Sequence, residues 1–115
     1  MYIINFSSDW GGKIYKDDFT TIRMLTRKWN VGDVVQICLN EQVMPNFFEI
    51  TNVEIKKLNE FTDEEISNDL GAEFVRKNGT PKEALMKIMN CFYSKKWYWK
   101  GEETEAQKIY LRRKR

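Results

Sequence analysis

One stretch, from Phe19 to Ile37, constrains the fold of this 115-residue chain more than any other. It reads FTTIRMLTRKWNVGDVVQI, in which Phe19, Thr21 and Arg23 recur with the period of two expected of a strand, and valines flank the turn-forming pair Gly32-Asp33. This combination predicts two strands that meet at a tight turn. The connection between them carries three basic or aromatic side chains: Arg27, Lys28 and Trp29.

The rest of the first half predicts further strands and one weak helix. Tyr2 to Phe6 is rich in β-branched and aromatic residues and predicts a first strand. The spacing of apolar residues from Trp10 to Lys16 permits about two turns of helix, although each of its two glycines weakens a helix by about 1 kcal/mol. Leu39 to Pro45 is polar and contains a proline, which predicts a loop. Asn46 to Ile55 alternates imperfectly and predicts a strand with one buried face.

Two helix starts are well marked. Thr62 to Glu65 and Thr80 to Glu83 are both capping boxes, and the second has Pro81 at the first helical position. The first helix is acidic and should stop at Gly71. The second helix carries an apolar stripe that predicts packing on a core rather than ligand binding, formed by Leu85, Ile88, Met89 and Phe92.

The C-terminal part interleaves lysines with aromatic residues before a final strand, Lys108 to Arg112, and a basic end at 113–115. Lys95, Lys96 and Trp97 have the side chains needed to stack bases and neutralise phosphates. Alternatively, Trp97 and Trp99 point the same way from a strand into the core. The sequence leaves both interpretations open.

Length and composition favour one domain over residues 1–115, with 111–115 as a basic C-terminal tail, since 42% apolar content supports one core. No apolar run reaches the roughly 18 residues of a membrane span, so we expect a cytoplasmic protein without a membrane partner. The two cysteines, Cys38 and Cys91, are expected to be buried free thiols. With no histidine and no CxxC pair, we expect neither a metal site nor a cofactor.

Charge is unevenly distributed although the net charge is only +2. From Arg76 to Arg115 there are twelve basic and four acidic residues, so the preceding part is net negative. Clustered Lys and Arg attract polyanions, chiefly phosphate backbones. The distribution therefore predicts a nucleic acid as partner, although a solvated tail is the plainer alternative.

The absence of histidine excludes Ser-His and Cys-His nucleophiles, so a proton transfer would need a carboxylate, lysine, tyrosine or cysteine. No glycine-rich phosphate loop is present. The polar groups expected to converge in one cleft are Thr21 and Arg23, because Arg23 offers a planar fork for a phosphate or a base edge. Four further cations are expected nearby: Lys13, Lys16, Arg27 and Lys28.

The order of these motifs resembles the ASCH domain, a small β-barrel of the PUA-like group. The matching features are the Thr-x-Arg strand, the run Val31 to Val35, the run Thr51 to Ile55 and a short acidic helix from Leu58 to Leu70. The resemblance extends from Ile4 to Tyr93. It implies an α+β fold class, a small PUA-like β-barrel with two or three short helices packed around it, and RNA rather than DNA as the ligand.

One enzymatic branch of that family, the acetylcytidine amidohydrolases, has a lysine three residues before a nucleophilic threonine, and a glutamate after the acidic helix. On this chain the threonine falls on Thr21, the lysine on Asp18, and the glutamate near Asp69 or Glu73. A carboxylate beside Thr21 would raise the pKa of its hydroxyl, so this motif is broken unless Lys16 reaches over. The resemblance implies the fold more strongly than the activity, and Thr21 is otherwise an ordinary strand residue.

Three hypotheses follow. The first is an RNA-binding module that uses a basic cleft with these residues: Lys13, Lys16, Thr21, Arg23, Arg27, Lys28, Trp29, Lys95, Lys96, Trp97, Arg112 and Arg113. The second is a small hydrolase of a modified nucleoside or RNA, with Thr21, Lys16 or Lys13, and Asp69 or Glu73 as its catalytic groups. The third is a regulatory protein that binds a host protein through the acidic face at Glu60 to Glu73.

Overall fold

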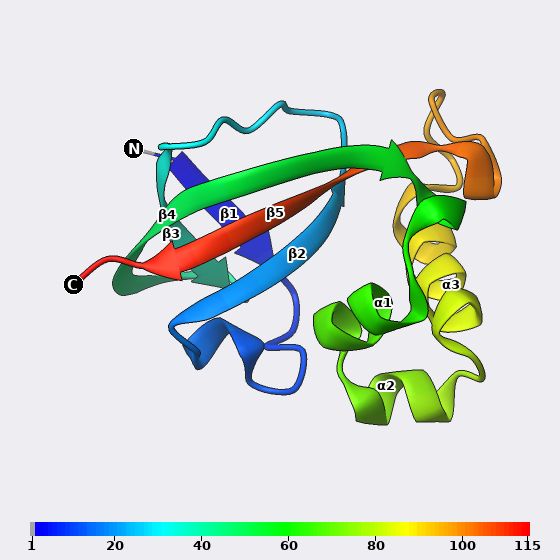
Figure 1. The fold of residues 1–115 in the computed structure, drawn as a ribbon, viewed down its shortest axis with the longest axis horizontal. Helices are drawn as coiled ribbons and strands as arrows, with labels where there is room; N and C mark the ends of the chain where they lie inside the picture. The colour runs from blue at the N-terminus through cyan, green and yellow to red at the C-terminus, as the bar shows by residue number, and fades with distance from the viewer. Residues whose placement is uncertain (1) are drawn as a thin grey trace.

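The computed structural model describes residues 2–115 and places a sheet at one end of the molecule and the main helices at the other (Figure 1). The strands are β1 (Tyr2–Phe6), β2 (Asp18–Met24), β3 (Val34–Leu39), β4 (Gln42–Lys57) and β5 (Glu105–Arg113). The helices are α1 (Asp63–Leu70), α2 (Ala72–Lys77) and α3 (Pro81–Tyr93), with 3₁₀ turns η1 (Lys13–Tyr15), η2 (Leu58–Glu60) and η3 (Gly101–Glu103). The fold is mixed α+β.

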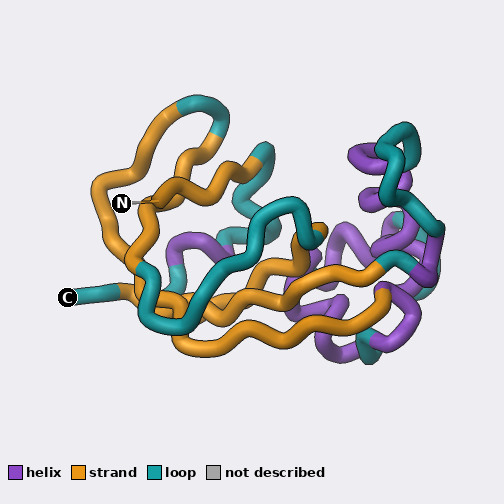
Figure 2. The backbone as a smooth tube through the Cα atoms, turned by 90° about the horizontal axis from the view of Figure 1, so that it is seen from above, coloured by secondary structure: helices purple, strands orange, loops and turns teal. Residues whose placement is uncertain are grey.

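The five strands form one open sheet in the order β1-β3-β4-β5-β2, so the prediction of a closed barrel is wrong. Only β1 and β3 are parallel, and β1 and β2 are the two edges. Side chains occupy the gap where a closing ladder would run. Arg23 on β2 donates to the backbone carbonyl of Asn5 on β1, and the rings of Phe6 and Phe19 meet edge to face, 6.2 Å between centroids. Seen from above, the strands curve around one part of the molecule and the main helices lie at the other end (Figure 2).

The predicted tight turn between β2 and β3 is wrong, because the two strands lie far apart in the sheet and residues 25–33 join them. Hydrogen bonds fix this connection to β4 and β5, the two strands that lie between β3 and β2 in the sheet. Gln107 on β5 donates to the carbonyls of Met24 and Arg27, and Ile50 on β4 exchanges backbone hydrogen bonds with Gly32 and Asp33. Gly32 has a φ of 94°, which favours glycine at that point.

Leu39 to Pro45 is not a loop, since β3 and β4 form a hairpin with Asn40 and Glu41 at its turn. Both turn residues have positive φ, 49° and 71°, as a two-residue hairpin turn requires. Pro45 lies in β4 where the register with β3 shifts. A proline is tolerated there because a bulge has no ladder bond for its missing N–H.

The two predicted helix starts are confirmed. Thr62 and Thr80 each accept a hydrogen bond from the backbone N–H of the glutamate three residues on, and α1 ends at Gly71. The short helix α2 was not predicted. The two helical turns expected over Trp10 to Lys16 shrink to the 3₁₀ turn η1, because Trp10, Gly11 and Gly12 all have positive φ.

Buried apolar residues form two clusters rather than one. The sheet core lies on the concave side of the strands and includes Ile4, Val35, Ile37, Phe48 and Ile109. The helix core joins the three helices to the end of the sheet and includes Ile22, Phe61, Ile66, Leu85 and Met89. Trp10 packs against both clusters. The connection before β2 therefore lies where the two cores meet.

Cys38 on β3 is buried as predicted, whereas Cys91 on α3 is exposed, because it faces away from the helix core. Both are free thiols. Within residues 2–115, no helix has the length and apolar content needed to span a membrane. β5 extends to Arg113, so most of the predicted 111–115 tail belongs to an interior strand of the sheet.

Candidate functional site

A pocket of about 580 Å³ lies where the open edges of the sheet meet the helices. Its walls come from β1, β2, the segment before β2, the end of β3 with the turn that follows it, and the helices α1 and α3. Thr21 and Arg23 of β2 both line it, so the structure brings together the two polar groups that the sequence predicted to share a cleft. The remaining wall is largely apolar and aromatic, with Phe6, Trp10 and Phe92.

A buried ion pair lies at this pocket. Nζ of Lys13 is 2.6 Å from Oδ1 of Asp69, and it also donates to the Thr20 carbonyl at 2.7 Å. Both side chains are only 5% exposed. Loss of water around the two charges raises the pKa of Asp69 and lowers that of Lys13, and the attraction between the partners opposes these shifts. The pair ties η1 to α1 and places a lysine of depressed pKa in the pocket wall.

Thr21 and Arg23 are linked to each other as well as to the pocket. Nε of Arg23 donates to Oγ1 of Thr21 at 3.3 Å, and its guanidinium lies 4.5 Å from the centre of the Phe6 ring. Thr21 accepts this bond, so its own hydroxyl proton is available to another partner. Arg23 serves the fold too, through its bond to the Asn5 carbonyl. The site therefore offers one hydroxyl donor next to a guanidinium.

The other predicted catalytic residues lie elsewhere. Lys16 is exposed outside η1, and Lys13 occupies the pocket in its place. Asp18 is exposed and pairs with Arg112, with Nε to Oδ1 at 3.2 Å. An odd spacing of three along a strand puts Asp18 and Thr21 on opposite faces, so the expected carboxylate beside Thr21 is not there. Glu73 is exposed and pairs with Lys77.

The predicted basic and aromatic rim is only partly at the surface. Trp29 is 7% exposed and belongs to the sheet core, so it offers no stacking face. Arg27 and Lys28 are exposed. The guanidinium of Arg27 lies over the rings of Tyr2 and Trp29, 4.1 and 4.2 Å from their centres. Arg27 and Trp29 take these positions because hydrogen bonds from β4 and β5 anchor the 25–33 connection. The periodicity of the sequence did not reveal these long-range contacts.

The lysine and aromatic segment after α3 is a series of turns and not a strand. Lys95 and Lys96 are exposed, and Trp97 is 94% exposed, so the interpretation of Trp97 as a core residue is wrong. Trp99 instead packs against the helix core. The two tryptophans differ because turns, unlike a strand, do not place residues two apart on the same side.

The basic C-terminal residues have acidic partners. Arg112 pairs with Asp18, while Arg113 and Arg115 pair with Asp17. Arg113 also donates to the Tyr15 carbonyl. The two carboxylates at the start of β2, Asp17 and Asp18, thus neutralise part of the positive charge predicted to contact phosphates, because β2 and β5 pair side by side.

Sequence analysis missed the contribution of α3 to the pocket. Leu85 and Met89 are buried in the helix core and Ile88 packs against it, as predicted, but Ile88, Met89 and Phe92 also line the pocket. Phe92 is 49% exposed, which a residue committed to packing would not be. Its position at the end of the apolar stripe, next to Tyr93, was the only available signal.

Comparison with solved structures identifies the fold. The chain superposes with a TM-score of 0.68 on the crystal structure of an ASCH domain from Lactobacillus crispatus JV V101, with 11% sequence identity, over 97% of this chain and 78% of that one. This protein has an ASCH-like fold. No protein-family model matches the sequence, and no curated protein matches it. At this identity the comparison shows the fold alone, so the ligand of the pocket must be argued from the residues themselves.

Proposed function

We propose that the protein binds RNA by taking one unpaired base into the pocket between the sheet edges and α3. The observation that carries the proposal is the pocket itself, about 580 Å³, with mostly apolar walls and a few convergent polar groups. Pockets of about 300–1,000 Å³ with this kind of lining are typical of sites for small organic groups. RNA recognition commonly uses bases that are out of the helix, stacked on aromatic side chains and hydrogen-bonded at their edges.

Each part of this recognition has a residue in the pocket. Trp10 and Phe92 supply aromatic surface for a base. The Thr21 hydroxyl and the guanidinium of Arg23 supply a donor and a charged fork for its edge. Because the arginines of β5 already have carboxylate partners, we expect binding to depend on the pocket more than on a basic surface.

The test compares two phenylalanines of similar exposure. Phe92 lines the pocket, whereas Phe47 on β4 is exposed away from it. Single-stranded RNA oligonucleotides of each base are titrated by fluorescence anisotropy, with matching DNA and free nucleosides as separate arms. Loss of one stacking contact is worth about 1–3 kcal/mol, so F92A should bind about tenfold more weakly and F47A about as tightly as the wild type. Equal effects of the two variants, or equal binding of RNA and DNA, would contradict the proposal.

A second candidate function is hydrolysis of an acylated base. It is favoured by the buried Lys13, whose pKa is lowered by burial, in the same pocket as the Thr21 hydroxyl. In that reaction Oγ1 of Thr21 attacks the amide carbonyl, and its proton passes to the Lys13–Asp69 pair and then to the leaving amine. Water would then release the acyl group from Thr21 as a carboxylic acid.

Incubation with N4-acetylcytidine, followed by mass spectrometry of the nucleoside, tests this second candidate. Cytidine should accumulate with the wild type and not with T21V, which keeps the shape of the side chain. D18N should retain activity, because Asp18 is exposed and lies on the other face of β2. No cytidine from the wild type, or the same rate from T21V, would exclude Thr21 as a nucleophile for this substrate.

A further inference from the structure

A second, smaller hollow of about 250 Å³ borders the pocket. Asn5, Arg23 and Tyr93 line both spaces, so Arg23 stands between them. The smaller hollow is further lined by Thr26, Arg27 and Trp29 of the connection between β2 and β3. Its volume lies below the usual range for a drug-sized ligand and suits a single small group.

The charge of this hollow is positive and unbalanced. Two guanidiniums, from Arg23 and Arg27, line it, and no carboxylate does. Neither arginine forms an ion pair with any carboxylate of residues 2–115, in contrast to Arg112, Arg113 and Arg115. Arg23 is partly buried whereas Arg27 is exposed, so a bound anion would chiefly reduce the cost of the partly buried charge of Arg23.

The donors are also held in place before any ligand arrives. Arg27 is stacked on the rings of Tyr2 and Trp29, and its backbone carbonyl accepts from Gln107. Stacking leaves the N–H groups at the edge of its guanidinium free to bind an anion. Arg23 uses Nε and one N–H of Nη2 within the chain, which leaves further N–H donors.

We propose that this hollow, the anion subsite, binds a phosphate group through Arg23 and Arg27. The ligand is then a nucleotide or a phosphodiester of RNA, with its base in the larger pocket and its phosphate on the other side of Arg23. The assignment of the base rests on the proposed function. The assignment of the anion does not, because it follows from the charge and geometry of the smaller hollow alone.

The first experiment uses inorganic phosphate, which carries no base. The full-length protein, labelled with ¹⁵N, is titrated with phosphate at constant ionic strength maintained with chloride. We expect saturable changes at the amides of Asn5 and Thr26 and at the indole N–H of Trp29. R27Q should bind phosphate about tenfold more weakly, since a hydrogen-bonded charge contact is lost. K28Q is the matched control, because Lys28 is the adjacent exposed cation and does not line the hollow.

Three results would overturn the anion subsite: changes on adding phosphate that do not saturate, changes that fall on Lys95 and Lys96 instead, or equal weakening of phosphate binding by R27Q and K28Q.

The second experiment compares the affinity of the protein for nucleosides with its affinity for their monophosphates. If monophosphates bind at least about tenfold more tightly and R27Q removes that advantage, the joint site is supported. If phosphate binds as expected and F92A leaves nucleotide affinity unchanged, the proposed function fails while the anion subsite stands.

Discussion

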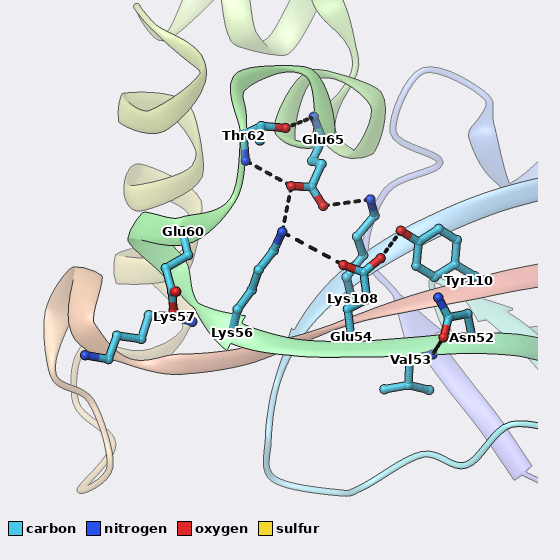
Figure 3. A network of polar contacts seen from close by, with 10 residues as sticks. All are labelled: Asn52, Val53, Glu54, Lys56, Lys57, Glu60, Thr62, Glu65, Lys108 and Tyr110. Atoms are coloured by element: carbon cyan, nitrogen blue, oxygen red, sulfur yellow. Dashed lines mark hydrogen bonds and ion pairs between the residues drawn. The ribbon is translucent and has the colours of Figure 1, made fainter.

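Two carboxylates of α1, one turn apart, join this helix to the rest of the fold in contrasting ways. Asp69 is 5% exposed and takes a single lysine, Lys13. Glu65 is 16% exposed and accepts from Lys56 and Lys108, both at 2.8 Å, and from the backbone N–H of Thr62 (Figure 3). Burial opposes the charge of both, yet their pKa values shift in opposite directions.

The balance between the depth of burial and the hydrogen-bond donors decides the direction of each pKa shift. Burial raises the pKa of Asp69, because Lys13 and the Ile22 backbone N–H compensate only part of the lost hydration. Burial alone would also raise the pKa of Glu65, but Lys108, Lys56 and Thr62 outweigh it and lower that pKa to about 2. Glu65 is therefore a satisfied structural contact. The Lys13–Asp69 pair is more deeply buried and borders a pocket, as functional groups often do.

The largest effect should come from breaking the buried pair. K13M leaves the Asp69 carboxyl buried without its cation, which should lower the free energy of unfolding by about 3–5 kcal/mol. Urea denaturation followed by tryptophan fluorescence measures it. The double variant K13M/D69L removes both charges and should recover most of the loss. A loss below about 1 kcal/mol for K13M would mean that the pair is not buried in solution.

Removal of the Glu65 carboxylate should lower the free energy of unfolding less than K13M does, and it should also change how that free energy depends on pH in acid. E65Q removes the charged acceptor of two lysines, and we expect a loss of about 2 kcal/mol at pH 7. Because the folded pKa of about 2 lies below the usual value of 4.5, the unfolded chain takes up the proton first. The contribution of Glu65 to stability is thus present above pH 4.5 and is lost as the pH falls toward 2.

Denaturation curves at several pH values separate this contribution from the rest. Between pH 4.5 and 2, the wild type should lose the stability that depends on Glu65, and E65Q should lose correspondingly less. Parallel curves for the two proteins in that range would show that Glu65 has an ordinary pKa, and the contrast with Asp69 would then disappear.

Sequence reasoning recovered the features that are local. The capping boxes at Thr62 and Thr80 fix the starts of α1 and α3 through contacts three residues apart, so the sequence alone predicts them. Thr21 and Arg23 share a strand face for a similarly local reason, the period of two. The order of motifs also predicted the ASCH-like fold that structural comparison then supported.

What the sequence did not predict depends on contacts distant along the chain. The sequence left Lys13 and Lys16 open as alternatives. Lys13 is the one that reaches the pocket, because it pairs with Asp69, a partner 56 residues away in the sequence that no spacing rule reveals. Asp18 pairs with Arg112 across β2 and β5 and lies on the opposite face of β2 from Thr21, so its expected effect on Thr21 is absent. The separation of β2 from β3 has the same origin, since Gln107 anchors their connection from β5.

The two lysines that pair with Glu65 should contribute unequally to the free energy of unfolding. Lys108 is 10% exposed and Lys56 is 23% exposed, so solvent screens Lys56 more strongly. K108M should lower stability by about 1–2 kcal/mol and K56M by about 0.5 kcal/mol. A double-mutant cycle of each with E65Q measures the coupling directly. A larger coupling for Lys56 would indicate that geometry, and not burial, ranks these contacts.

The smallest effect should come from the pair between Glu73 and Lys77 on α2, whose side chains are 72% and 67% exposed. Its geometry resembles that of the other pairs, with Nζ and Oε1 3.1 Å apart, so it differs from them mainly in its access to water. K77Q should change the free energy of unfolding by no more than about 0.5 kcal/mol, as measured by urea denaturation in low and high salt. If K77Q cost as much as E65Q, pairing alone would explain the stability of these contacts. Burial could then no longer distinguish the Lys13–Asp69 pair from an ordinary ion pair, and the case for a functional lysine in the pocket would lose its energetic basis.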